Sequence, residues 1–167
     1  MDPGADELMN QSIRLTGEEA MLAFATQAAP VFRNGGVIFL EGTLGAGKTT
    51  LSRGLIQALG HPGAVRSPTY TLVEEYRLPD ITVCHFDLYR LGDPEELEYI
   101  GIRDYFGDDR LSLIEWPQRG TGMLPTADLL ITIDDDVQSR ILSWTGQTER
   151  GREWCRQLDV LSTEQSV

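Results

Sequence analysis

Residues 42–49, Gly42-Thr43-Leu44-Gly45-Ala46-Gly47-Lys48-Thr49, match the pattern G-x-x-x-x-G-K-[ST] at every fixed position. A short apolar run at 37–40 precedes them and predicts a strand buried on both faces, and a helix is predicted over 48–59. In this context the glycines let successive backbone N–H groups curl around one anion, at the positive end of the helix. We therefore expect these residues to bind the phosphates of a nucleotide.

The motif assigns separate tasks to its last two residues. Lys48 is expected to reach the β- and γ-phosphates, and the Thr49 hydroxyl to take a place on Mg²⁺. Lys48 is also the single lysine of the chain, because the other 13 of the 14 basic residues are arginine. GTPases read guanine with an Asn-Lys-x-Asp segment, which would need a second lysine, so ATP is the expected nucleotide.

The remaining pattern predicts an α/β fold, namely a P-loop NTPase-like mixed sheet with a parallel core, antiparallel hairpin additions and flanking helices. Two strand-like segments around the turn at 77–80 predict the hairpin. Thr16 and Glu19 form a capping-box pattern at the start of the first helix, and Pro30 should disturb its last turn. Strands are expected at 37–40, 71–76, 81–86, 111–115, 129–133 and 140–144, and helices at 17–33, 48–59, 93–101 and 149–158.

Composition restricts the class of protein. A length of 167 residues suits a single P-loop domain, with flexible ends expected at 1–12 and 160–167. The 26 acidic and 14 basic residues give a formal net charge of −12, which disfavours direct binding to nucleic acid or to an anionic membrane surface. No apolar run approaches the roughly 20 residues of a spanning helix. Cys84 and Cys155 form no metal-binding spacing, and a cytoplasmic protein is expected.

Two acidic residues follow strand-like segments and are candidates for holding the metal or the attacking water. Glu115 ends the apolar run 111–114, and Asp87 ends the segment 81–86. One of them can act through metal-bound water while the other orients the water that attacks; either can also be an ordinary solvated acid. His85, in the segment 81–86, is expected to have a structural role. The run Asp134-Asp135-Asp136 is expected to be a solvated turn, because consecutive acids point in different directions.

Two further features near the candidate site have open interpretations. The hydroxyl-rich stretch Ser67-Pro68-Thr69-Tyr70-Thr71 is either a switch loop that completes the metal shell or a turn punctuated by proline. Trp116, directly after Glu115, is either a packing residue or a stacking surface at the mouth of the site. Residue chemistry alone leaves both choices open.

Several blocks of the chain together resemble the TsaE family. The most specific are the loop at 42–50, the Phe-Asp-Leu-Tyr-Arg block at 86–90 and the Glu-Trp-Pro block at 115–117. The resemblance covers about residues 14–133, in the same order and at similar spacing. TsaE is the small bacterial ATPase required to make the threonylcarbamoyladenosine modification of tRNA, beside the anticodon. The other matching blocks are 67–76, 85–91, 95–97, 101–106 and 124–125.

The resemblance implies a ligand set. ATP or ADP and Mg²⁺ would be the cofactors, bound by the residues of the loop together with Thr50. Lys48, Thr49 and Thr50 would bind phosphates and metal, and Glu115 would ligate Mg²⁺. Thr69 would belong to a switch region, Asp87 would be important for hydrolysis, and Trp116 would lie close to the nucleotide.

The resemblance also implies partners. The family acts with a threonylcarbamoyl transferase subunit and a paralogous scaffold subunit, and reaches tRNA only through that complex. Two other functions remain open from the residues alone: a small-molecule kinase that uses the same loop, and a nucleotide-gated interaction module without turnover. A kinase needs an arginine-bearing lid, for which Arg103, Arg110 and Arg119 are the available residues.

Overall fold

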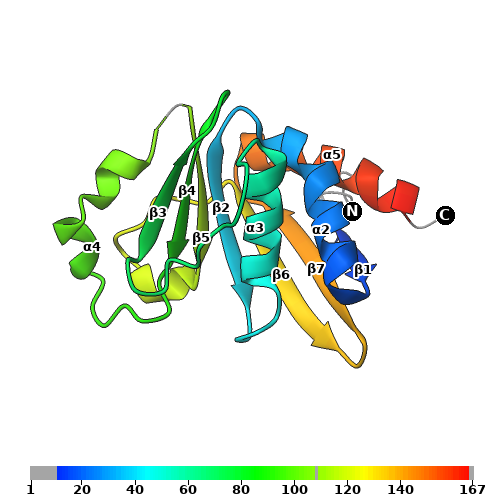
Figure 1. The fold of residues 1–167 in the computed structure, drawn as a ribbon, viewed down its shortest axis with the longest axis horizontal. Coiled ribbons are helices and arrows are strands. Elements are labelled where there is room, and N and C mark those ends of the chain that lie inside the picture. Colours follow the sequence, from blue (N-terminus) through cyan, green and yellow to red (C-terminus); the bar gives the residue numbers. More distant parts are fainter. Residues whose placement is uncertain (1–10, 108, 166–167) are drawn as a thin grey trace, which may run out of the picture.

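The computed structural model describes residues 11–107 and 109–165. Seven strands form one sheet in this part of the chain: β1 (Gln11–Leu15), β2 (Gly36–Gly42), β3 (Val73–Arg77), β4 (Thr82–Asp87), β5 (Arg110–Glu115), β6 (Leu129–Asp136) and β7 (Ser139–Gly146). Their order is β1-β7-β6-β2-β5-β4-β3 (Figure 1). Neighbours from β6 to β4 are parallel, whereas β7, β1 and β3 pair antiparallel. The predicted mixed sheet with a parallel core is confirmed.

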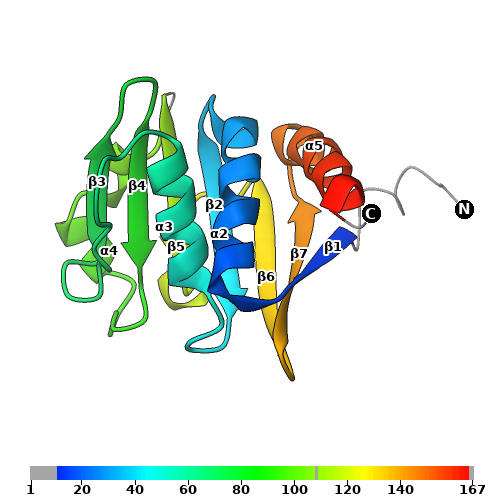
Figure 2. The same ribbon diagram turned by 45° about the vertical axis from the view of Figure 1, so that its right-hand side comes forward.

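The larger core lies between the sheet and three helices. The helical segments are α2 (Gly17–Ala28), η1 (Ala29–Phe32), α3 (Lys48–Ala58), α4 (Glu96–Tyr99), η2 (Ile102–Tyr105), η3 (Pro117–Gly120) and α5 (Glu149–Gln165). Helices α2 and α3 lie side by side across the middle of the sheet, and α5 covers its β7 end (Figure 2). Phe24 stacks on Trp144, and Phe32 meets Trp154 edge to face, which joins these helices to the core.

A second, smaller core lies on the opposite face of the sheet, where short helical segments cover β4 and β5. Side chains alternate between the two faces along each strand. Phe86 and Ile114 therefore face the smaller core, while Val83 and Leu113 face α3 and the larger one. The same alternation puts the odd-numbered residues at the ends of β4 and β5 on the α3 side, next to the glycine-rich loop.

Most of the predicted elements are confirmed, and their differences have local causes. The first helix changes to a 3₁₀ turn at Ala29, where Pro30 was expected to disturb it. The prediction of a capping box is wrong, because the Thr16 side chain makes no hydrogen bond at the start of the helix. The last helix is longer than expected and reaches Gln165. Of the ends expected to be flexible, residues 1–10, 166 and 167 lie outside the described residues.

Two features of the β1–β7–β6 half of the sheet differ from the sequence interpretation. Strand β1 was not predicted; it pairs with β7 over its whole length and buries Ile13 and Leu15. The run 134–136 is not a turn but the exposed end of β6, and the turn consists of Val137 and Gln138. Asp135 forms an ion pair with Arg140 of β7, and Asp136 forms one with Arg14 of β1. No helix in the described ranges is long and apolar enough to cross a bilayer.

Asp128, just before β6, joins three parts of the larger core. Its side chain accepts hydrogen bonds from the backbone N–H of Val37 at 2.9 Å and from the Thr148 hydroxyl at 2.7 Å. Gly151 of α5 packs so closely on this residue that a Cβ atom built there would lie 1.7 Å from the Asp128 carbonyl oxygen. The approach of α5 to the sheet therefore requires glycine at position 151.

Gly151→Ala should destabilise the protein by about 2–3 kcal/mol or more, because the added methyl forces α5 away from a well-packed contact. Urea denaturation followed by circular dichroism measures the change. Gly92→Ala is the matched control, since a Cβ atom there meets nothing closer than 3.9 Å. Equal stability of the two variants would contradict this account of how α5 is attached.

Candidate functional site

The glycine-rich loop joins β2 to α3 and has the backbone that an anion-binding loop needs. Gly45 and Gly47 have φ values of +83° and +114°, a region that other residues rarely adopt. Gly47 caps α3, so the first backbone N–H groups of that helix face the loop. Gly42 lets the start of the loop pack closely against β6, because a Cβ atom at this position would lie 2.7 Å from the Ile133 carbonyl oxygen.

Lys48 is buried beneath the loop, with 4% of its surface exposed. Its Nζ atom donates to the carbonyl oxygens of Gly42 at 2.7 Å and Thr43 at 2.9 Å. Burial lowers the pKa of Lys48, while the nearby carboxylates of Glu115 and Asp87 act in the opposite direction. The ammonium group thus lies among the groups expected to surround a phosphate.

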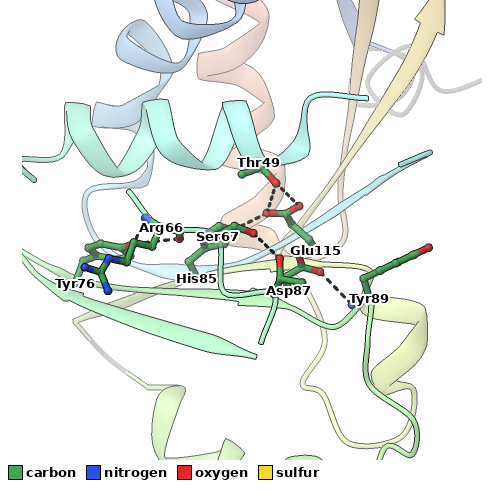
Figure 3. Close-up of polar contacts among 9 residues, drawn as sticks. Thr49, Arg66, Ser67, Tyr76, His85, Asp87, Tyr89 and Glu115 are labelled. Carbon is green, nitrogen blue, oxygen red and sulfur yellow. Dashed lines mark hydrogen bonds and ion pairs between the residues drawn. The ribbon is translucent and has the colours of Figure 1, made fainter. Parts of the chain in front are cut away.

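Glu115 ends β5 and accepts or shares hydrogen bonds with side chains from two other elements (Figure 3). The Thr49 hydroxyl donates to its Oε1 at 3.1 Å, and His85 Nε2 lies 2.5 Å from its Oε2. Only 2% of Glu115 and none of His85 is exposed. The pairing of Thr49 with Glu115 brings together the two residues predicted to hold Mg²⁺.

Asp87 ends β4, and the parallel register places it directly opposite Glu115. Its Oδ1 accepts the backbone N–H of Tyr89 at 3.0 Å (Figure 3). Burial raises the pKa of Asp87; the hydrogen bond from Tyr89 lowers it, and the charge of Glu115 raises it. A carboxylate in this position is a better proton acceptor than an exposed aspartate.

Trp116 forms one wall of the site and is held in an unusual backbone conformation, with φ +58° and ψ +49°. Its ring lies under the Lys48 ammonium, 4.3 Å from Nζ to the ring centroid, and against Tyr89, with centroids 5.0 Å apart. The Arg119 guanidinium lies over the Tyr89 ring, with its central carbon 5.4 Å from the ring centroid. The structure therefore places Trp116 beside the lysine of the loop.

Two hollows flank the loop. The first, of about 160 Å³, lies over the strand ends and is lined by Leu44, Gly45, Gly47, Lys48, Thr49, Thr50, Asp87, Glu115 and Trp116. The second, of about 340 Å³, lies on the other side of the same glycines and is lined by Gly17, Glu18, Met21, Gly45, Ala46, Gly47, Thr50, Gln138 and Arg140. Both hollows border Gly45, Gly47 and Thr50.

Thr69 is not among the residues that line either hollow. Its hydroxyl pairs with that of Ser67 at 2.8 Å, in the segment between α3 and β3. Tyr76 anchors this segment, because its hydroxyl accepts the backbone N–H of Arg66 at 3.2 Å (Figure 3). A role of Thr69 in switching stays a prediction.

Sequence reasoning missed two contributors to the site. His85 was expected to be structural, yet its ring contacts the central carboxylate. Arg140 of β7 donates to the Ala46 carbonyl oxygen at 2.9 Å and pairs with Asp135 at 2.9 Å, which ties the loop to the far half of the sheet. No local signal marks Arg140, because its partner in the loop is 94 residues away.

No cluster of three or more His, Cys, Asp or Glu side chains suited to a metal occurs in the described ranges. The donor set of Thr49 and Glu115 nevertheless fits Mg²⁺, which typically binds through one or two carboxylates and completes its shell with phosphate oxygens and water. A metal here is therefore expected to bind together with a nucleotide.

A sequence profile of the family described as "Threonylcarbamoyl adenosine biosynthesis protein TsaE" matches residues 15–142. This chain belongs to the TsaE family. A Haemophilus influenzae relative named tRNA threonylcarbamoyladenosine biosynthesis protein TsaE is 55% identical over 116 residues, covering 70% of this chain and 73% of the relative. A Bacillus subtilis relative of the same name is 35% identical over 149 residues, covering 87% and 91%.

A solved structure has the same fold as this chain. The chain described as "Crystal structure of Bacillus subtilus YdiB" superimposes with a TM-score of 0.76 and 30% sequence identity, and the match covers 91% of this chain and 95% of that one. The resemblance to TsaE inferred from the loop and strand-end motifs is confirmed.

Asp87→Asn should stabilise the protein at pH 7. The pKa of Asp87 is raised on folding, so its ionised form costs stability above that pKa, and the cost disappears as the pH falls toward the ordinary aspartate range. Urea denaturation from pH 7 to pH 4 should show an advantage for the variant that shrinks with falling pH. Exposed Asp80→Asn is the control, and a destabilised Asp87→Asn at pH 7 would contradict the expectation.

Proposed function

We propose that this protein binds and hydrolyses ATP with Mg²⁺ as a component of the machinery for tRNA threonylcarbamoyladenosine modification. The observation that carries the proposal is the contact of Thr49 with Glu115 directly below the glycine-rich loop. It supports a metal position beside a phosphate position in a member of the TsaE family. The process comes from the names of the relatives.

The reaction is the transfer of the terminal phosphoryl group to water. Mg²⁺, when bound, supplies charge that stabilises the phosphates. Lys48 and the N–H groups of the loop bind and orient the phosphates, and Glu115 with Thr49 holds the metal. Asp87 faces the same hollow and orients the attacking water, whose proton it can accept. Catalysis then depends mostly on positioning and electrostatic stabilisation.

The hollow on the other side of the loop suits the base and sugar of the nucleotide. Its volume of about 340 Å³ and its mixed lining of Met21, Glu18 and Arg140 fit a flat, partly polar ligand. Since this hollow shares the loop with the phosphate site, one nucleotide can extend through both.

The partners in the proposal are a threonylcarbamoyl transferase subunit and its paralogous scaffold subunit, which the protein joins in a nucleotide-dependent manner. Tyr70 is 84% exposed and lies under Arg90 near the site, so the surface there is free to contact another protein. The net charge of −12 favours reaching tRNA only through that complex.

A small-molecule kinase is less well supported, because the three available arginines do not gather over the site. Arg110 begins β5, at the opposite end of the strand from Glu115, and pairs with Glu75 at 3.0 Å. Arg103 lines a separate hollow beside α4, and only Arg119 lies near Trp116, through Tyr89.

Phosphate release from Mg-ATP tests the proposal, measured alone and with the two partner proteins. Partners should stimulate release, and Lys48→Ala should reduce it by about 10²-fold or more, as expected for the loss of a charge-stabilising group. Lys48→Arg should not restore it, because the planar guanidinium does not fit a position built for a compact ammonium. Arg33→Ala, on an exposed residue away from the site, is the control.

Two results would contradict the proposal. Release that persists in Lys48→Ala would place the reaction elsewhere. Nucleotide binding without release under any partner condition would favour an interaction module without turnover.

Gln138→Trp tests the assignment of the second hollow to the base. The larger side chain at the rim of that hollow should weaken ATP binding about 10-fold or more but leave the affinity for tripolyphosphate unchanged, because only the base is obstructed. Calorimetric titration measures both affinities. Val137→Trp is the matched control, since Val137 is 94% exposed and does not line the hollow. Equal losses for ATP and tripolyphosphate would contradict the assignment.

A further inference from the structure

The imidazole of His85 is hydrogen-bonded to the Glu115 carboxylate, which is expected to hold the metal. The ring is completely buried in β4, and its Nε2 lies 2.5 Å from Glu115 Oε2. The Thr49 hydroxyl lies 3.1 Å from Oε1 of Glu115 and 3.4 Å from Oε2. His85 thus engages Oε2 from within the sheet, while Thr49 contacts both oxygens from the side of the loop.

The second nitrogen of the ring shows that this contact is not part of a wider structural network. Within the described ranges, His85 Nδ1 is buried and has no hydrogen-bond partner. Leaving a buried polar atom unpaired costs stability, so a histidine used only for packing would be better replaced by an apolar residue. A hydrogen on Nε2 lets the ring donate to the Glu115 carboxylate, which is an acceptor when ionised.

The position of His85 in the sheet also directs its side chain toward Glu115. His85 lies two residues before Asp87 on β4 and therefore on the same face, toward Glu115 and α3. Neighbouring residues of β4 fill the hydrophobic cores, with Val83 in the larger one and Phe86 in the smaller one. His85 and Asp87 are the buried polar residues on this face of β4, and His85 is the one whose side chain contacts the Glu115 carboxylate.

We propose that His85 is a positioning residue that holds the Glu115 carboxylate in the orientation needed for Mg²⁺. This inference rests on the proposed function. A group that fixes a metal-binding side chain commonly changes metal affinity by about 10–100-fold when it is removed. His85 therefore sets how strongly Mg²⁺ and the nucleotide reinforce each other's binding, without contacting the nucleotide.

The test compares His85→Gln with His85→Asn. The glutamine amide nitrogen extends as far as Nε2 and can donate to Glu115, whereas that of asparagine ends one methylene short, near the place of Nδ1. ADP affinity is measured by calorimetric titration in EDTA and over a series of MgCl₂ concentrations. In His85→Asn the Mg²⁺ concentration that gives half of the enhancement should rise about 10-fold or more. His85→Gln should stay within about 2-fold of the original protein.

Affinity for ADP in EDTA should be unchanged in both variants, because the loop and Lys48 bind phosphate without His85. Thermal unfolding checks that both variants fold; if the asparagine variant does not, the volume-conserving His85→Met provides the same loss of the donor. An original Mg²⁺ dependence in the variant without a donor would overturn the inference, as would an equal shift in His85→Gln. If the unaltered protein shows no Mg²⁺-dependent ADP binding at all, the proposed function falls with it.

Discussion

The parallel register of β2, β5 and β4 is the constraint on which the candidate site depends. It sets Leu40, Glu115 and Asp87 in one row across three strands, and Glu115 and Asp87 are the last residues of theirs. Parallel strands end at the same edge, so the loop after β2 and the acids of β5 and β4 meet there. Helix α3 then brings Thr49 down onto Glu115. A slip of one residue in either pairing would turn these carboxylates to the other face of the sheet.

This arrangement buries charged groups, and hydrogen bonds must offset the free-energy cost of removing them from water. Lys48, Asp87 and Glu115 are each less than a tenth exposed. An ion removed from water costs several kcal/mol unless it is paired and hydrogen-bonded. Neighbouring groups provide these hydrogen bonds. Lys48 donates to carbonyl oxygens of the loop, and the Glu115 carboxylate accepts a hydrogen bond from the Thr49 hydroxyl and contacts His85. The two hydrophobic cores on either face supply the rigidity that holds these groups in place.

The sequence predicts those parts of the molecule whose causes are local. The loop, the buried β2 and the hairpin of β3 and β4 follow from motif, apolar runs and turn residues. Strand β1 has only Ile13 and Leu15 as apolar residues and becomes a strand by pairing with β7, far along the chain. The acidic end of β6 is likewise held by pairing across the strands, with Arg140 opposite Asp135. Contacts of this kind leave no local pattern.

Three residues at the site have local features that are unfavourable on their own. Trp116 adopts a left-handed backbone, Asp87 is buried with a raised pKa, and His85 Nδ1 is unpaired within the described ranges. Unfavourable local features persist where the surrounding structure enforces them, and they mark functional positions more often than chance. Lys48 shows the same conflict, because it is a buried cation whose hydrogen bonds to Gly42 and Thr43 are made to neutral carbonyl oxygens of its own loop. In the proposed function, a phosphate would give this ammonium a charged acceptor, and hydrogen bonds between charged groups are the stronger kind. The buried groups therefore suit the nucleotide-bound state of the proposal better than they suit the loop alone.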